Sequence, residues 1–113
     1  MTSDDLLLAL GKEDVLTRKR CAVIIHRYLQ ETLKEKDEIN IEREYKIKDL
    51  FDCRICANHI AQVVLKGIMD VRKYPGDILL FEPDKEVTPE EISDIVKRAV
   101  DLKERKDPAI WGL

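Results

Sequence analysis

The sequence predicts an all-α fold, built of helix–loop–helix units with three main helices and a short extended segment in a loop. Three stretches carry apolar residues at intervals of three and four, the spacing of one buried helix face. Two of these stretches follow a threonine in the N-cap position, Thr17 and Thr88. Aromatic residues are only 5% of the chain, so the core must be built from leucine, isoleucine, valine and alanine.

A short helix is expected at the N-terminus, where residues 1–13 hold the apolar cluster Leu6 to Leu10, ended by Gly11. We expect the leucines to pack on the body, and a frayed start is the alternative. The first long helix begins after Thr17, whose hydroxyl can accept a backbone N–H. Its expected buried face consists of Cys21, Ala22, Ile24, Ile25, Tyr28, Leu29, Thr32 and Leu33.

The second helix is expected from about Arg54 to Gly67, after a highly charged connection that ends near Tyr45. Gly67 suits the C-terminal end of the helix because glycine adopts positive φ without steric cost. The expected buried face consists of Cys56, Ile60, Val63, Val64 and Ile68.

The loop that follows contains Pro75-Gly76, which predicts a turn over residues 72–77. Ile78 to Phe81 is apolar and is expected to form a short extended piece. The third helix begins after Thr88, with proline at the first helical position and Glu91 in place for a capping box. Its expected buried face consists of Ile92, Ile95, Val96, Ala99 and Val100.

Length and charge limit the function classes. The chain has 113 residues, which predicts one domain, and its net charge of -3 is small and mixed, which disfavours nucleic-acid binding. No apolar run reaches the roughly 18 residues of a membrane span. The acidic start is unlike a secretory signal, which predicts a cytoplasmic location unless the chain is cut from a longer precursor. The odd number of cysteines, 3, excludes a full disulfide framework and favours a reduced compartment.

The pattern from Ile47 onward resembles the S-layer homology repeat. Ile47 to Leu50 matches the lead-in of that repeat, Lys66-Gly67-Ile68 its first-helix ending, and Phe81 to Asp84 its loop. Val87-Thr88-Pro89-Glu90-Glu91 matches its second-helix opening. Val15-Leu16-Thr17-Arg18 resembles the same opening in a preceding repeat. The resemblance implies a half repeat over 15–46, a complete repeat over 47–102 and a tail over 103–113.

The resemblance implies a non-catalytic binding or scaffolding module, associated with bacterial cell-surface polysaccharide. The arginine of the family's second-helix opening contacts an acidic sugar, and that role falls on Arg18. Pro89 replaces the arginine in the second opening, and Ile55 stands where the family has tryptophan. The alternatives are a cytoplasmic protein-interaction module that reuses the fold and a small zinc-stabilised module.

One and a half repeats would leave apolar surface uncovered, because repeat units bury their faces against neighbours. We therefore expect a homo-oligomer. The alternative is that the N-terminal leucines and the C-terminal residues 110–113 cap the exposed ends. The only tryptophan, Trp111, either docks on the body or anchors a partner.

Cys53, Cys56 and His59 form the one local cluster of metal-ligand types, and Cys21 or His26 would have to supply a fourth ligand for zinc. The alternative is a buried Cys56 thiol beside a turn cysteine. A redox role for the C-x-x-C is a third reading, because a position near a helix start lowers a thiol pKa.

A second candidate site is the basic cluster Arg18, Lys19 and Arg20, which could bind an anion through side chains and free backbone N–H groups together. A solvated face is the alternative. His26, on the first helix, is expected to be a boundary histidine rather than a ligand. The sequence holds no Ser/His/Asp set, phosphate loop or EF-hand spacing, so we expect no enzyme and no resident cofactor other than zinc. The resemblance implies a polysaccharide partner, and a protein partner is the alternative.

Overall fold

A computed structural model describes residues 3–12 and 14–113; the ends of the predicted N-terminal segment, residues 1–2 and 13, lie outside it. The described chain contains four α-helices and five short 3-10 helices, which lie in the connections and in the C-terminal tail. The helices are α1 (Ser3–Gly11), α2 (Arg18–Glu31), α3 (Ala57–Leu65) and α4 (Pro89–Val100), and the strands are β1 (Arg72–Tyr74) and β2 (Ile78–Leu80). The 3-10 helices are Glu42–Lys46, Leu50–Asp52, Arg54–Cys56, Leu102–Glu104 and Pro108–Trp111.

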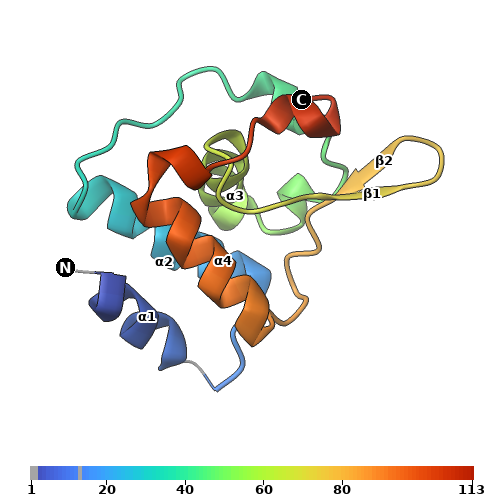
Figure 1. The fold of residues 1–113 in the computed structure, drawn as a ribbon. Coiled ribbons are helices and arrows are strands. Elements are labelled where there is room, and N and C mark those ends of the chain that lie inside the picture. The colour runs from blue at the N-terminus through green and yellow to red at the C-terminus, as the bar shows by residue number, and fades with distance from the viewer. Residues whose placement is uncertain (1–2, 13) are drawn as a thin grey trace.

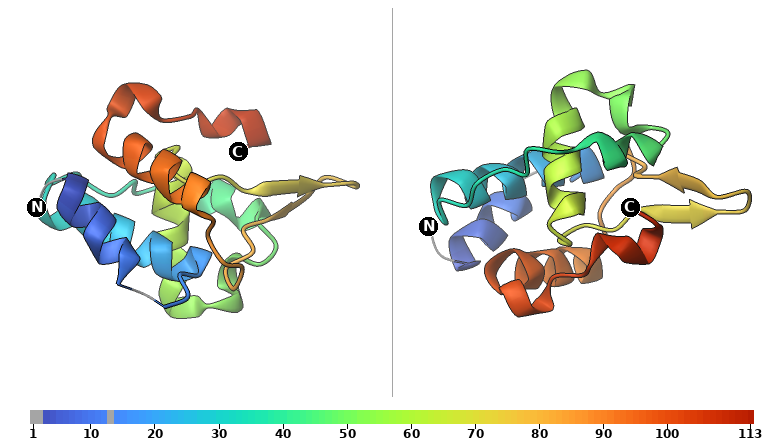
Figure 2. Two further views of the ribbon diagram at one scale, coloured as in Figure 1. Left: turned by 60° about the horizontal axis from the view of Figure 1, so that its bottom comes forward. Right: turned by 90° about the horizontal axis from the view of Figure 1, so that it is seen from above.

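The four α-helices pack around one apolar core. α2 contacts α1, α3 and α4, and α1 also lies against α4 (Figures 1 and 2). The N-terminal leucines were expected to pack on the body, and this is confirmed for Leu6 and Leu10, which are buried, whereas Leu7 and Leu8 are exposed. Trp111 is half-buried and packs against the same core, as expected for a docked tail.

Both predicted N-caps are present, and they have the same backbone geometry. Thr17 has φ -80° and ψ 159° and accepts from the Arg20 N–H, while Thr88 has φ -79° and ψ 159° and accepts from the Glu91 N–H. The residues before the two caps are hydrogen-bonded to each other, because the Val87 N–H donates to the Leu16 carbonyl at 2.8 Å. Two segments that are distant in the chain therefore start their helices side by side.

The prediction of a purely all-α fold is wrong, because β1 and β2 form an antiparallel hairpin (Figure 1). Arg72 pairs with Leu80 and Tyr74 with Ile78. The expected extended piece at Ile78 is confirmed as β2, but the expected turn occupies only residues 75–77. β1 has no alternation of apolar residues that could reveal it, and its pairing is fixed by β2, whose Leu79 is buried in the core.

The second predicted helix begins later than expected, because residues Arg54–Cys56 form a 3-10 turn before α3. Gly67 has a φ of 74°, as the predicted C-terminal stop requires. In the described part of the chain, no helix is both long and apolar enough to span a membrane.

Candidate functional site

Among the cavities that charged side chains line in the described residues, two contain residues of the predicted basic cluster. The first, called the arginine network below, surrounds a cavity of about 190 Å³ and consists of Arg18, Asp70, Arg72, Glu91, Asp94 and Arg98. The second, called the basic pocket below, has a volume of about 330 Å³ and is lined by Lys19, Arg20, Val23, Arg27, Ile55, Cys56 and His59.

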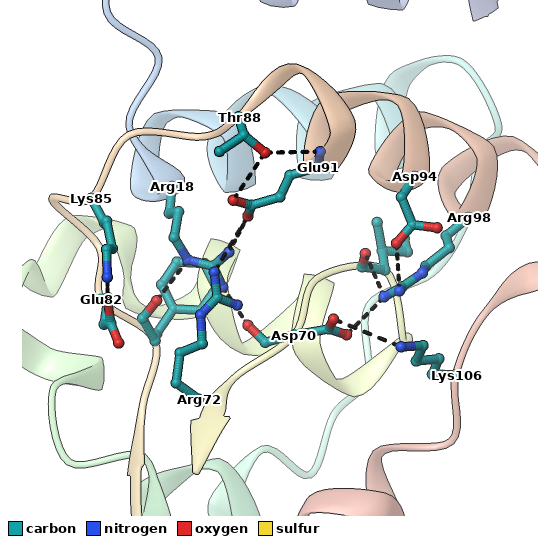
Figure 3. Close-up of polar contacts among 12 residues, drawn as sticks. Arg18, Asp70, Arg72, Glu82, Lys85, Thr88, Glu91, Asp94, Arg98 and Lys106 are labelled. Atoms are coloured by element: carbon teal, nitrogen blue, oxygen red, sulfur yellow. Dashed lines mark hydrogen bonds and ion pairs between the residues drawn. The ribbon is translucent and has the colours of Figure 1, made fainter. Parts of the chain in front are cut away.

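Arg18 is the centre of the arginine network, and all of its guanidinium nitrogens donate within the protein. Its Nε donates to the Phe81 carbonyl at 2.7 Å, one Nη to Glu91 at 3.0 Å and the other Nη to the Asp70 carbonyl (Figure 3). The Arg18 side chain is only 2% exposed. Burial lowers the pKa of Arg18, and Arg72 lowers it further, while Glu91 opposes both. Arg18 therefore joins α2 to α4, to the loop before β1 and to Phe81 after β2, and each of its three side-chain nitrogens has a partner within the protein.

The other arginines of the network are also paired with carboxylates. Arg98 contacts Asp70 at 2.7 Å and Asp94 at 2.5 Å, and Arg72 lies 3.5 Å from Glu91 (Figure 3). Three arginines thus face three carboxylates. Because these charges compensate one another, the network is suited to fixing α4 on the body rather than to holding an anion.

The basic pocket is built where α2 meets the start of α3. Arg20, Val23 and Arg27 follow at spacings of three and four, which places them on one face of α2. The opposite wall comes from the 3-10 turn and α3, with Ile55 88% exposed beside the half-buried His59. The pocket therefore offers cations next to an apolar surface.

The described lining of the basic pocket is positively charged. Three of its residues are Lys or Arg, and this lining includes no Asp or Glu. Lys19 also forms an ion pair with Asp84 at 2.6 Å, at the edge of the loop before α4. The arrangement favours a group with negative charge, such as a carboxylate or a phosphate.

The structure separates the predicted basic cluster. Arg18 belongs to the arginine network, whereas Lys19 and Arg20 line the basic pocket. The expected free N–H groups at the helix start are not free: the Arg18 and Lys19 N–H groups donate to the Lys85 and Pro83 carbonyls, and the Arg20 N–H to Thr17. That part of the prediction is wrong, because the loop before α4 covers the start of α2. Anion binding here must rely on side chains.

The predicted cysteine cluster lies at the edge of the basic pocket, but its sulfur atoms are joined. Cys53 and Cys56 form a disulfide across the 3-10 turn, with their Cα atoms 5.2 Å apart. The expectation of a separate buried thiol at Cys56 is therefore wrong. Cys21 is the remaining cysteine, and burial raises the pKa of its thiol to about 12. Its thiol is accordingly unreactive at neutral pH.

A chain of three side chains leads from the surface to the basic pocket. Asp37 lies 2.6 Å from His26 Nε2, and His26 Nδ1 lies 2.8 Å from His59 Nδ1. Burial opposes ionisation of Asp37, but hydrogen bonds with His26, Asn58 and Gln30 outweigh it and lower its pKa. Burial lowers the pKa of His59, and His26 and Arg27 lower it further, so His59 is neutral at pH 7.

His26 is buried rather than the boundary histidine that was expected, and it uses both ring nitrogens within the protein. Among residues 3–12 and 14–113, no three His, Cys, Asp or Glu side chains converge as a metal site. The predicted zinc ligands are instead engaged elsewhere, two in the disulfide and His59 with His26.

Sequence reasoning missed Arg27, Ile55 and the contact between His26 and His59. The spacing of Arg20, Val23 and Arg27 could have revealed a second face of α2, because it falls outside the buried stripe. The histidine contact joins residues 33 positions apart and has no local signal. No family model, curated protein or solved structure matches this chain.

Proposed function

We propose that this chain is a non-catalytic binding module that holds an acidic group of a cell-surface polysaccharide in the basic pocket. The observation that supports it most directly is the described lining of that pocket, to which Lys19, Arg20 and Arg27 contribute positive charge and no residue contributes a carboxylate. Arginine binds carboxylate and phosphate groups through paired N–H donors.

The apolar part of the pocket suits a sugar ring. Ile55 is exposed and Val23 lies on the facing helix, so the C–H face of a ring can pack there while its acidic substituent reaches the cations. The repeats that the sequence resembles have a tryptophan at the position of Ile55. Both residues place a large apolar side chain there.

The resemblance to S-layer homology repeats supports the same ligand class. The two resembling openings begin with the same N-cap geometry and lie hydrogen-bonded to each other, as two copies of one structural unit would. One feature differs from the family. Arg18 positions the helices here, and Lys19, Arg20 and Arg27 on α2 would bind the ligand instead.

The test uses a soluble acidic wall polysaccharide and the same polysaccharide with its carboxyl groups reduced to alcohols. Isothermal titration should show binding of the acidic form only. Arg27→Gln should weaken it about tenfold, the usual effect of losing one charge-assisted hydrogen bond. Lys103→Gln removes the same charge from the exposed turn after α4 and should leave binding unchanged. Equal binding of both polysaccharides, or no binding of either, would reject the proposal.

A further inference from the structure

The disulfide between Cys53 and Cys56 lies where a ligand of the basic pocket would meet it. Cys56 lines the pocket with 8% of its surface exposed, and Cys53 is half-buried at the start of the helical segment that continues into α3. Lys19, Arg20 and Arg27 surround the same cavity. A disulfide beside cations is open to attack by a thiolate, because positive charge favours the ionised form of a thiol.

The histidine chain provides a proton acceptor at the same place. Ionised Asp37 can only accept, so the proton between it and His26 is on Nε2 of His26. One further proton lies between the two Nδ1 atoms of His26 and His59. Since Nδ1 of His59 faces His26, its Nε2 is the ring nitrogen that remains for the pocket.

Protonation of His59 at Nε2 can be relayed inward. As Nε2 takes a proton, the Nδ1 proton of His59 passes to Nδ1 of His26. His26 Nε2 lies 2.6 Å from the Asp37 carboxylate, so the three side chains form a hydrogen-bonded path for that proton from the pocket to Asp37.

We propose that the Cys53–Cys56 disulfide is a redox-active site that exchanges with anionic low-molecular-weight thiols bound in the basic pocket. The thiol gives its proton to His59 Nε2, and its sulfur attacks the Cys56 sulfur. The Cys53–Cys56 bond breaks, and a mixed disulfide forms between Cys56 and the thiol. Cys53 leaves as a thiolate and takes the proton back from His59.

A second thiol completes the reduction. It attacks the mixed disulfide, releases the Cys56 thiol and leaves with the first thiol as a small-molecule disulfide. Two thiols are thus oxidised, and the protein disulfide is reduced to two thiols. Thiol exchange would occur in the same pocket as the saccharide binding of the proposed function. Exchange requires only the charge of that pocket and not the binding of a saccharide.

The first experiment needs no variant. The oxidised chain is mixed with glutathione, an anionic thiol, or with cysteamine, a cationic one, and the reaction is stopped with acid. Intact mass spectrometry should find a mixed disulfide, and peptide mapping should place it at Cys56. Exchange should be at least about tenfold faster with glutathione, after correction for the ionisation of each free thiol. Equal corrected rates for the two thiols would overturn the proposal.

Two variants test the pocket and the proton acceptor. Arg20→Gln with Arg27→Gln should remove the preference for glutathione, whereas Lys103→Gln should keep it. His59→Gln should slow exchange at least about tenfold at pH 6.5 and match the unaltered chain at pH 9, where the thiol ionises without help. Slowing to the same extent at both pH values would indicate a structural effect and would overturn the proton-acceptor role.

The same samples separate the competing readings. One equivalent of zinc held by the reduced chain against glutathione would overturn the proposal in favour of the metal site at Cys53, Cys56 and His59. Charge-selective exchange without binding of the acidic polysaccharide would reject the proposed function and leave the redox site standing. Binding of the polysaccharide without thiol exchange would overturn the redox site and leave the proposed function standing.

Discussion

The carbonyl oxygen of Lys106 lies against Gly67 so closely that a Cβ atom at position 67 would be only 1.8 Å from it. The Lys106 N–H also donates to the Gly67 carbonyl at 3.0 Å. Gly67 thus ends α3 with positive φ and anchors the C-terminal tail to that end, two functions that both require a residue without a side chain.

Gly67→Ala should lower the free energy of unfolding by about 3 kcal/mol, because alanine adds both left-handed strain and a backbone clash. Urea denaturation followed by circular dichroism measures the change. Gly76→Ala is the matched control, since Gly76 has a φ of 83° but a Cβ atom at that position would meet no atom within 4 Å, so only the strain of about 1 kcal/mol remains. Equal losses in the two variants would contradict the clash.

Arg18→Gln should cost about 3–5 kcal/mol, because Glu91 would lose its buried partner and two carbonyls would lose a donor. Arg72→Gln is the control: Arg72 also reaches Glu91, but it is one-third exposed and contributes less than about 1 kcal/mol. Unfolding in urea compares the two. A cost for Arg18→Gln as small as that for Arg72→Gln would show that the network is not essential to the fold.

Glu44 makes stability depend on pH. Its side chain is 0% exposed, its carboxylate has no hydrogen-bond partner in the described residues, and burial raises its pKa to about 7 although Arg43 opposes the shift. The folded state therefore favours the neutral acid. Stability is full below the unfolded pKa near 4.5 and falls as pH rises toward 7, by about 3 kcal/mol in total.

Glu44→Gln should remove this loss. The stability difference between the variant and the unaltered chain should therefore shift by about 3 kcal/mol in favour of glutamine between pH 4 and pH 8. Chemical denaturation at both pH values measures it. Comparing the pH-dependent change, rather than stability at one pH, cancels the packing difference between the side chains. A constant difference across this range would contradict the shifted pKa.

Asp49 holds the loop that leads to α4. Its carboxylate accepts from the Phe81 N–H at 2.7 Å and from the Glu82 N–H at 2.8 Å. Asp49→Ala should cost about 2–3 kcal/mol, since two backbone donors lose a charged acceptor. Asp52→Ala changes an exposed aspartate in the same turn and should cost less than about 0.5 kcal/mol. Thermal unfolding should rank the two variants in this order, and the reverse order would contradict the role of Asp49.

Local signals predicted the helices well. Thr17 and Thr88 cap their helices as expected, and Gly67 ends the helical segment, because capping and positive φ depend on a few consecutive residues. The role of Asp49 as an acceptor in a turn was also predictable in kind, although its partners, 32 and 33 residues away, were not.

The candidate site was predicted only in part. Lys19 and Arg20 were named from the sequence, but the pocket exists because α3 and the turn before it bring Ile55, Cys56 and His59 opposite Arg27. Arg18 had the same sequence signal as its neighbours, yet its position on the helix directs it into the protein. The contact of His26 with His59 likewise depends on how α2 crosses α3.

The sequence by itself determined that α2 and α4 begin after Thr17 and Thr88 and which apolar residues form most of their buried faces, although Leu33 and Val100, expected to be buried, are exposed. Only the tertiary structure decided that Arg72–Tyr74 pairs as a strand, that Arg18 is buried and that the charges of Lys19, Arg20 and Arg27 share one pocket. These features are contacts between distant segments, and their energies depend on packing and on exclusion of water, which no stretch of sequence specifies alone.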